Sequence, residues 1–124
     1  MPKTILIAAN DPNIIYLLRR YAEASGFQVV RGDFGEDLLR LAKQVDPVLI
    51  LLEIEPPETS WRPYLERLKT DLQTKHIPVV VYSCFDDMVC DPINNIASFL
   101  QKSVMYNDFL AALKSAGVHP VDPI

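Results

Sequence analysis

Runs of consecutive apolar residues alternate along this chain with segments in which apolar residues recur every three or four positions. The most apolar run, 48–52, lies between Pro47 and Pro56 and ends at Glu53. Such a run predicts a strand that is buried on both faces, as is typical of the centre of a parallel sheet. Similar runs predict further strands at 4–9, 27–30, 77–83 and 97–100.

Helical periodicity fills most of the segments between these strands. The Asn-Asp-Pro sequence at 10–12 combines capping residues with a proline suited to a first turn, so a helix should begin there and end at Gly26. The same spacing predicts helices at 38–45, 64–72 and 108–116. The segment 84–96 is rich in Asp, Asn and Pro, and we expect only a short or broken helix in it.

This alternation predicts an α/β domain in which a parallel five-stranded sheet is covered by helices on both faces, since parallel strands need helical crossovers. The chain has 124 residues, of which 49% are apolar, and a single domain of that size can bury a core without disulfides or metal. We expect the domain to span 1–117, and we expect 118–124 to form an extended tail that contains two prolines.

Composition excludes several classes of function. The net charge of -4 comes from 12 basic and 16 acidic residues with no block of Lys or Arg, so we expect no direct nucleic-acid partner. No run approaches the roughly 20 apolar residues of a membrane span, and we expect a cytoplasmic protein. Cys84 and Cys90 match no redox or zinc spacing and are interpreted as reduced thiols. His76 and His119 are isolated and assigned to solvated loops.

Polar side chains follow four of the predicted strands. Asn10 and Asp11 come after the first strand, Glu53 ends the third, Ser83 ends the fourth and Lys102 follows the fifth. The carboxyl ends of parallel strands meet at one edge of the sheet, where open α/β folds place their ligand sites. We therefore expect an acidic pocket with one hydroxyl and one ammonium group.

From Lys3 to about Ala116 the chain resembles the receiver domain of two-component response regulators. The matching features are the pair at 10–11, Glu53 with Pro57 four positions later, Ser83 and Lys102. The resemblance implies a three-layer, doubly wound fold like flavodoxin, with strand order 2-1-3-4-5.

The resemblance also implies roles for individual residues. Glu53 would stand at the phosphoacceptor position, and Asp11 and Glu53 would be the metal ligands for one Mg²⁺. Ser83 and Phe99 would rearrange on activation, and Lys102 would contact the phosphoryl group. No other cofactor is implied.

Two departures from the family pattern bear on this chemistry. The family phosphoacceptor is aspartate, and the additional methylene of Glu53 displaces the carboxylate by more than the ~1 Å that already costs orders of magnitude in rate. Asn10 replaces one acid of the pair, so two carboxylates remain for a cation that prefers anionic oxygens. We expect no phosphorylation by the usual aspartyl route, and weak Mg²⁺ binding or none.

Several residues have a second, purely structural interpretation. Glu53 either imitates a phosphorylated aspartate or forms a structural ion pair with Lys102, and the ion pair is favoured because one carboxylate rarely shifts a two-state equilibrium fully. Asp11 can be a helix cap, a site residue or both, and Ser83 can be a simple strand-ending residue. Phe99 is expected in the core, and Trp61 is expected to pack over the third helix rather than to be exposed.

The leading functional hypothesis is a non-enzymatic, receiver-like signalling module that acts by protein–protein interaction. A histidine kinase or an output protein would be the partner, and a homodimer is a further option, through a surface at 87–95 and 106–114. The alternatives are a receiver that retains Mg²⁺ binding and phosphoryl acceptance, and the receiver fragment of a longer transcriptional regulator. A nucleotide-binding domain is disfavoured because the turn 9–13 lacks glycine.

Overall fold

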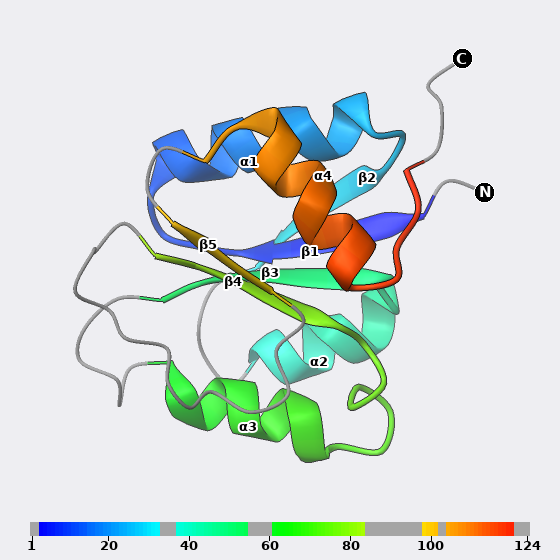
Figure 1. The fold of residues 1–124 in the computed structure, drawn as a ribbon. Helices are drawn as coiled ribbons and strands as arrows, with labels where there is room; N and C mark the ends of the chain where they lie inside the picture. Colours follow the sequence, from blue (N-terminus) through cyan, green and yellow to red (C-terminus); the bar gives the residue numbers. More distant parts are fainter. Residues whose placement is uncertain (1–2, 33–36, 55–60, 84–97, 102–103, 121–124) are drawn as a thin grey trace.

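A computed structural model of the protein describes residues 3–32, 37–54, 61–83, 98–101 and 104–120 (Figure 1). The strands are β1 (Thr4–Ala8), β2 (Gln28–Gly32), β3 (Leu49–Glu53), β4 (Val79–Ser83) and β5 (Ser98–Gln101). They form a five-stranded sheet in the order β2-β1-β3-β4-β5, and every neighbouring pair is parallel. The predicted fold class and strand order are thus confirmed.

Helices cover both faces of the sheet. The helices of the described residues are α1 (Pro12–Ala24), α2 (Asp37–Val45), α3 (Arg62–Thr70) and α4 (Tyr106–Ser115). Helices α1 and α4 lie on one face, and α2 and α3 lie on the other (Figure 1). The expected short helix at 84–96 falls outside the described residues. None of the helices in the described part of the chain is both long and apolar enough to span a membrane.

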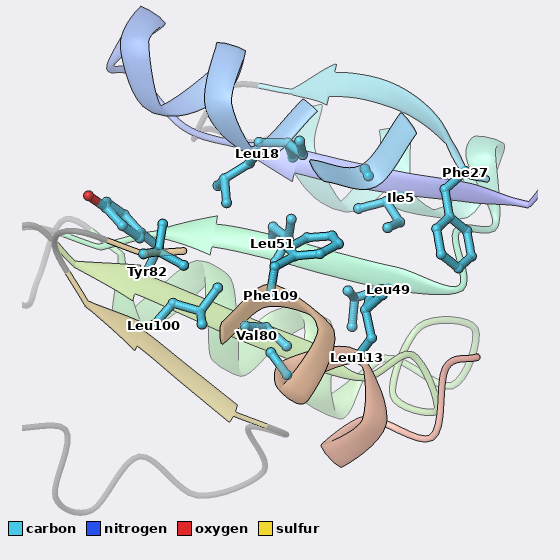
Figure 2. Packing of buried hydrophobic residues seen from close by; sticks show 14 of the residues in the cluster. Ile5, Leu18, Phe27, Leu49, Leu51, Val80, Tyr82, Leu100, Phe109 and Leu113 are labelled. Atoms are coloured by element: carbon cyan, nitrogen blue, oxygen red, sulfur yellow. The ribbon is translucent and has the colours of Figure 1, made fainter. Parts of the chain in front are cut away.

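The sheet separates two apolar clusters. β3 and β4 are buried along their whole length, which explains why both read as uninterrupted apolar runs. The first cluster lies under α1 and α4, where Phe109 packs against Leu51 of β3 (Figure 2). The second lies under α2 and α3 and includes Leu38, Leu65 and Val81. Trp61 belongs to this second cluster, as predicted.

Glycines end α1 and α4 at the predicted positions. Gly26 and Gly117 have φ of 89° and 74°, in the left-handed region that glycine adopts without steric cost. After each glycine the next N–H returns to the helix: Phe27 donates to the carbonyl of Ala22 at 3.0 Å, and Val118 donates to that of Leu113 at 2.9 Å. Both ends are Schellman motifs, which satisfy carbonyls that would otherwise lack partners.

The third helix is shorter than its apolar spacing predicted. α3 ends at Thr70, and Leu72, which we expected within the helix, is 80% exposed. The reason is Asp71, whose backbone is extended and whose carboxylate accepts the N–H of Gln73 at 2.8 Å. An aspartate that binds the backbone two residues on favours a turn over another helical turn.

Candidate functional site

Glu53 occupies the carboxyl end of the central strand and is nearly buried. β3 lies between β1 and β4, and Glu53 itself pairs in register with Tyr82. Only 7% of Glu53 is exposed. A carboxylate so far removed from water must be compensated by hydrogen bonds or by an opposite charge.

Backbone amides of the β1–α1 loop provide that compensation. Glu53 Oε1 accepts the N–H of Asn10 at 2.9 Å and the N–H of Asp11 at 3.3 Å. These amides lie beside the first turn of α1, where the helix dipole also favours negative charge. The carboxylate is therefore directed toward β1, and its placement follows from donors that sequence patterns do not reveal.

Asp11 serves as the cap of α1. Its Oδ1 atom accepts the N–H of Asn13 at 2.9 Å, and Pro12 stands in the first helical turn. The predicted cap role is confirmed, and it coexists with a position beside Glu53. Asn10 is exposed. The structure thus brings Asn10, Asp11 and Glu53 together at one edge of the sheet.

Of the remaining predicted site residues, Ser83 is described in full, and Phe99 is described by its backbone alone. Ser83 ends β4 and is fully buried, in register with Gln101 of β5. Phe99 lies in β5 in register with Val81, and its side chain is outside the described residues. Lys102 is also outside them, so its contact with Glu53 stays a prediction. Cys84 and Cys90 fall in the same undescribed group.

The donor atoms at this edge fit Mg²⁺ poorly. Among the described residues, no three His, Cys, Asp or Glu side chains are grouped so that they could hold a metal ion. The carboxylates of Asp11 and Glu53 both accept backbone N–H groups, with which a cation would have to compete. Mg²⁺ favours near-octahedral oxygen coordination with anionic ligands, and this arrangement offers little of it.

A groove formed by residues of α1 together with Tyr106 of α4 was not anticipated from the sequence. It has a volume of about 350 Å³ and is lined by Tyr16, Leu17, Arg20, Tyr21, Ala24 and Tyr106, and we refer to it as the tyrosine groove. The lining residues of α1 recur three or four positions apart, and this spacing could have indicated that they share one face of the helix. The position of Tyr106 could not be predicted in this way, because it depends on how α4 packs beside α1.

Hydrogen bonds fix the side chains of the tyrosine groove. The Tyr21 hydroxyl donates to the carbonyl of Val104 at 3.1 Å, and the Tyr106 hydroxyl lies 3.1 Å from Ser25 Oγ. At the rim, Arg20 lies over the ring of Tyr16 at 5.7 Å from the ring centroid and donates to its hydroxyl at 3.2 Å. Tyr16 is nonetheless 62% exposed, so a large aromatic surface faces solvent.

Trp61 lies just before α3 and is buried. It is 3% exposed, and the guanidinium of Arg62 lies 5.2 Å from the centroid of its ring. Within the part of the chain that the structure describes, its Nε1 atom has no hydrogen-bond partner. The prediction that it packs rather than projects is confirmed. His76 and His119 are exposed, as expected.

Comparisons with known proteins agree with this architecture. No family model matches the chain. It is 36% identical over 85 residues to the polar-differentiation response regulator DivK of Brucella anthropi, a match that covers 68% of this chain and 69% of the relative. The DivK of Brucella abortus strain 2308 is 35% identical over the same length.

Solved structures show the same fold at lower identity. A putative response regulator from Chloroflexus aurantiacus aligns with a TM-score of 0.79 and 19% identity, covering 94% of this chain and 98% of the other. The signal receiver domain of a histidine kinase from Syntrophus aciditrophicus gives a TM-score of 0.78 and 22% identity, covering 98% and 96%. With the strand order, the polar carboxyl edge and the DivK match together, the chain belongs to the receiver-domain family of two-component response regulators.

Proposed function

We propose that this chain is an atypical receiver that signals by binding a protein partner and is not phosphorylated by the usual aspartyl route. The observation that supports this proposal is the burial and hydrogen bonding of the Glu53 carboxylate. A glutamate stands at the end of β3, nearly buried, with Oε1 bound to two backbone amides. A module of this kind would have no enzymatic role. Its location in the cytoplasm stays a prediction.

The chemistry of phosphoryl transfer disfavours Glu53 as the acceptor. The reaction depends almost entirely on positioning and on electrostatic stabilisation, and Mg²⁺ neutralises the charge that develops. Here Oε1, one of the two carboxylate oxygens of Glu53, accepts the N–H groups of Asn10 and Asp11, so the carboxylate is already directed toward the β1–α1 loop. We infer that Mg²⁺ binds weakly or not at all, because Asn10 contributes no carboxylate and Asp11 already caps α1.

The interaction half of the proposal is supported by the tyrosine groove. Receiver domains work together with histidine kinases and output proteins, and we propose a partner from these classes. Three of its six lining residues are tyrosines whose hydroxyl groups form hydrogen bonds, and such side chains present contact area at low cost in conformational entropy. Arg20 at its rim adds a cation and hydrogen-bond donors.

Phosphoryl acceptance is tested by exposing the purified chain to acetyl phosphate and Mg²⁺ and measuring the intact mass. We expect no phosphoryl adduct on the wild-type chain and none on Glu53→Gln. Glu53→Asp should gain an adduct if the rest of the pocket is competent. If it does not, Asn10→Asp combined with Glu53→Asp tests whether the missing acid also disables the site. A wild-type adduct that Glu53→Gln abolishes would overturn the proposal.

Partner binding is tested with the ¹⁵N-labelled chain and purified phosphotransfer domains of histidine kinases from the same organism. We expect amide shifts at Tyr16, Leu17 and Tyr106 and an affinity that falls at least about tenfold in Tyr16→Ala, since exposed aromatic residues dominate many interfaces. The exposed Glu66→Ala on α3 is the matched control. An affinity that is unchanged in Tyr16→Ala would show that the partner does not bind at the tyrosine groove.

A further inference from the structure

The contact between Glu53 and the β1–α1 loop joins segments that are distant in sequence. Its two hydrogen bonds span separations of 43 and 42 residues. The donors are successive amides, and the acceptor is one oxygen of a nearly buried carboxylate. Hydrogen bonds to a charged group are stronger than those between neutral groups, so this contact is a strong constraint on the loop.

The amides at the start of α1 have few other partners. The first N–H groups of a helix have no acceptor within the helix. Pro12 has no N–H, and the N–H of Asn13 binds the Asp11 side chain at 2.9 Å. The N–H of Ile15 donates to the carbonyl of Asp11 at 3.0 Å, which begins the helical pattern of hydrogen bonds. Glu53 supplies the acceptor for the two amides that precede them.

We propose that Glu53 is a positioning residue whose carboxylate ties the β1–α1 loop to the end of β3 and thereby sets the first turn of α1. The contact orients the loop at its last residue before the helix, and Asp11 takes part both as a donor to Glu53 and as the cap. Helix α1 bears Tyr16, Leu17 and Arg20 of the tyrosine groove, about one turn farther along.

This positioning role goes beyond the proposed function. It depends on the charge and the length of Glu53, not on whether the chain accepts a phosphoryl group or binds a partner. An aspartate at the same position would be one methylene shorter and could not keep both hydrogen bonds without a shift of the loop.

Two substitutions separate the carboxylate from the bulk of the side chain. Glu53→Met keeps an unbranched, buried side chain of similar length and removes the acceptor. Glu53→Gln keeps one carbonyl acceptor and removes the charge. Met is compatible with an apolar strand end, so the domain should fold in both variants. Glu66→Gln, on the exposed surface of α3, is the control for the loss of one negative charge.

The experiment measures amide hydrogen exchange and ¹⁵N shifts in these proteins at one pH. In Glu53→Met we expect the amides of Asn10 and Asp11 to exchange at least about tenfold faster, the effect of losing a charged hydrogen bond, with smaller changes in Glu53→Gln. Shifts should extend into α1 from Asn13 to Leu17, and Glu66→Gln should change none of these amides.

Two results would overturn the inference. In the first, Asn10 and Asp11 exchange at the wild-type rate in Glu53→Met, so the carboxylate does not hold the loop. In the second, exchange accelerates at these two amides while the resonances of Asn13 to Leu17 stay in place, so the contact does not position α1. Neither readout involves acetyl phosphate or a partner, so failure here is distinct from failure of the proposed function.

Discussion

One methylene group distinguishes glutamate from aspartate, and at the end of β3 that length decides which atoms the carboxylate meets. Oε1 of Glu53 lies 2.9 Å from the amide nitrogen of Asn10 and 3.3 Å from that of Asp11. The side chain is nearly buried, so these bonds are made where water competes little and electrostatic interactions are strong. The glutamate that the family resemblance predicts to stand at the phosphoacceptor position thus makes a structural contact with the loop.

Asp11 allows a direct test of capping at the residue scale. Asp11→Ala removes the acceptor for the N–H of Asn13 and should lower the free energy of unfolding by about 1 kcal/mol. Asp11→Asn keeps a good capping side chain and should lose much less. Urea unfolding followed by circular dichroism measures both. Equal losses in the two variants would mean that charge, not capping, is the main contribution of Asp11.

Trp61 combines full burial with an unsatisfied donor. Because its Nε1 atom has no partner among the described residues, Trp61→Phe removes a buried group whose desolvation costs roughly 1–3 kcal/mol while keeping most of the ring packing. We expect the free energy of unfolding to change by less than about 1 kcal/mol, whereas Trp61→Ala should lose about 3–5 kcal/mol. Circular dichroism is the suitable probe, since the substitution removes the one tryptophan of the chain. A large loss in Trp61→Phe would show that the indole N–H is satisfied in solution.

At the scale of elements, the strands and helix ends were predictable because local signals fix them. The apolar run ending at Glu53, bounded by prolines, predicted a strand buried on both faces, and Gly26 and Gly117 stand where the backbone is left-handed. Leu72 was misassigned because its apolar spacing was outweighed by the turn that Asp71 forms.

The parallel topology was enough to predict that Asp11 and Glu53 converge, but it did not predict the hydrogen bonds between them. The convergence of Asp11 and Glu53 follows from parallel strands sharing one carboxyl edge. The direction of the Glu53 carboxylate depends on backbone N–H donors. Every residue except proline has such a donor, so a sequence pattern does not show which of them the carboxylate will bind. The tyrosine groove likewise depends on how Tyr106 of α4 packs beside α1, a long-range feature.

The end of α4 offers a prediction at this scale. Gly117 has φ of 74°, and a Cβ built on it would meet no atom of the described residues within 4 Å, apart from its two chain neighbours. The cost of Gly117→Ala is therefore one of backbone conformation alone, and we expect a loss of about 1 kcal/mol in the free energy of unfolding. Gly117→Asn should cost less, because asparagine tolerates the left-handed region. Thermal unfolding of both variants checks this order, and an equal loss would contradict it.

At the scale of the whole molecule, charge contributes unevenly to stability. The pairs Arg19–Glu23 and Arg40–Asp37 lie within single helices and are well exposed, so each should contribute little. Lys43 and Asp71, at 3.0 Å, connect α2 to the segment after α3 and are less exposed. This pair thus ties α2 to the end of α3 on the same face of the sheet, and Asp71 also holds the turn that ends α3.

The pH dependence of stability should therefore reflect Asp71. The N–H of Gln73 and then Lys43 lower the pKa of Asp71 below its ordinary 3.8. Above pH 3.8 the carboxylate is ionised in both the folded and the unfolded chain, and its stabilising contribution is complete. Below that pH the unfolded chain takes up the proton first, so the contribution declines until the pH has fallen through the folded pKa. Asp71→Asn should flatten this part of the acid unfolding profile, measured by urea unfolding from pH 6 down to about pH 2.5, and the exposed Asp37→Asn should leave it almost unchanged. A profile unaltered by Asp71→Asn would show that other carboxylates govern the acid limb.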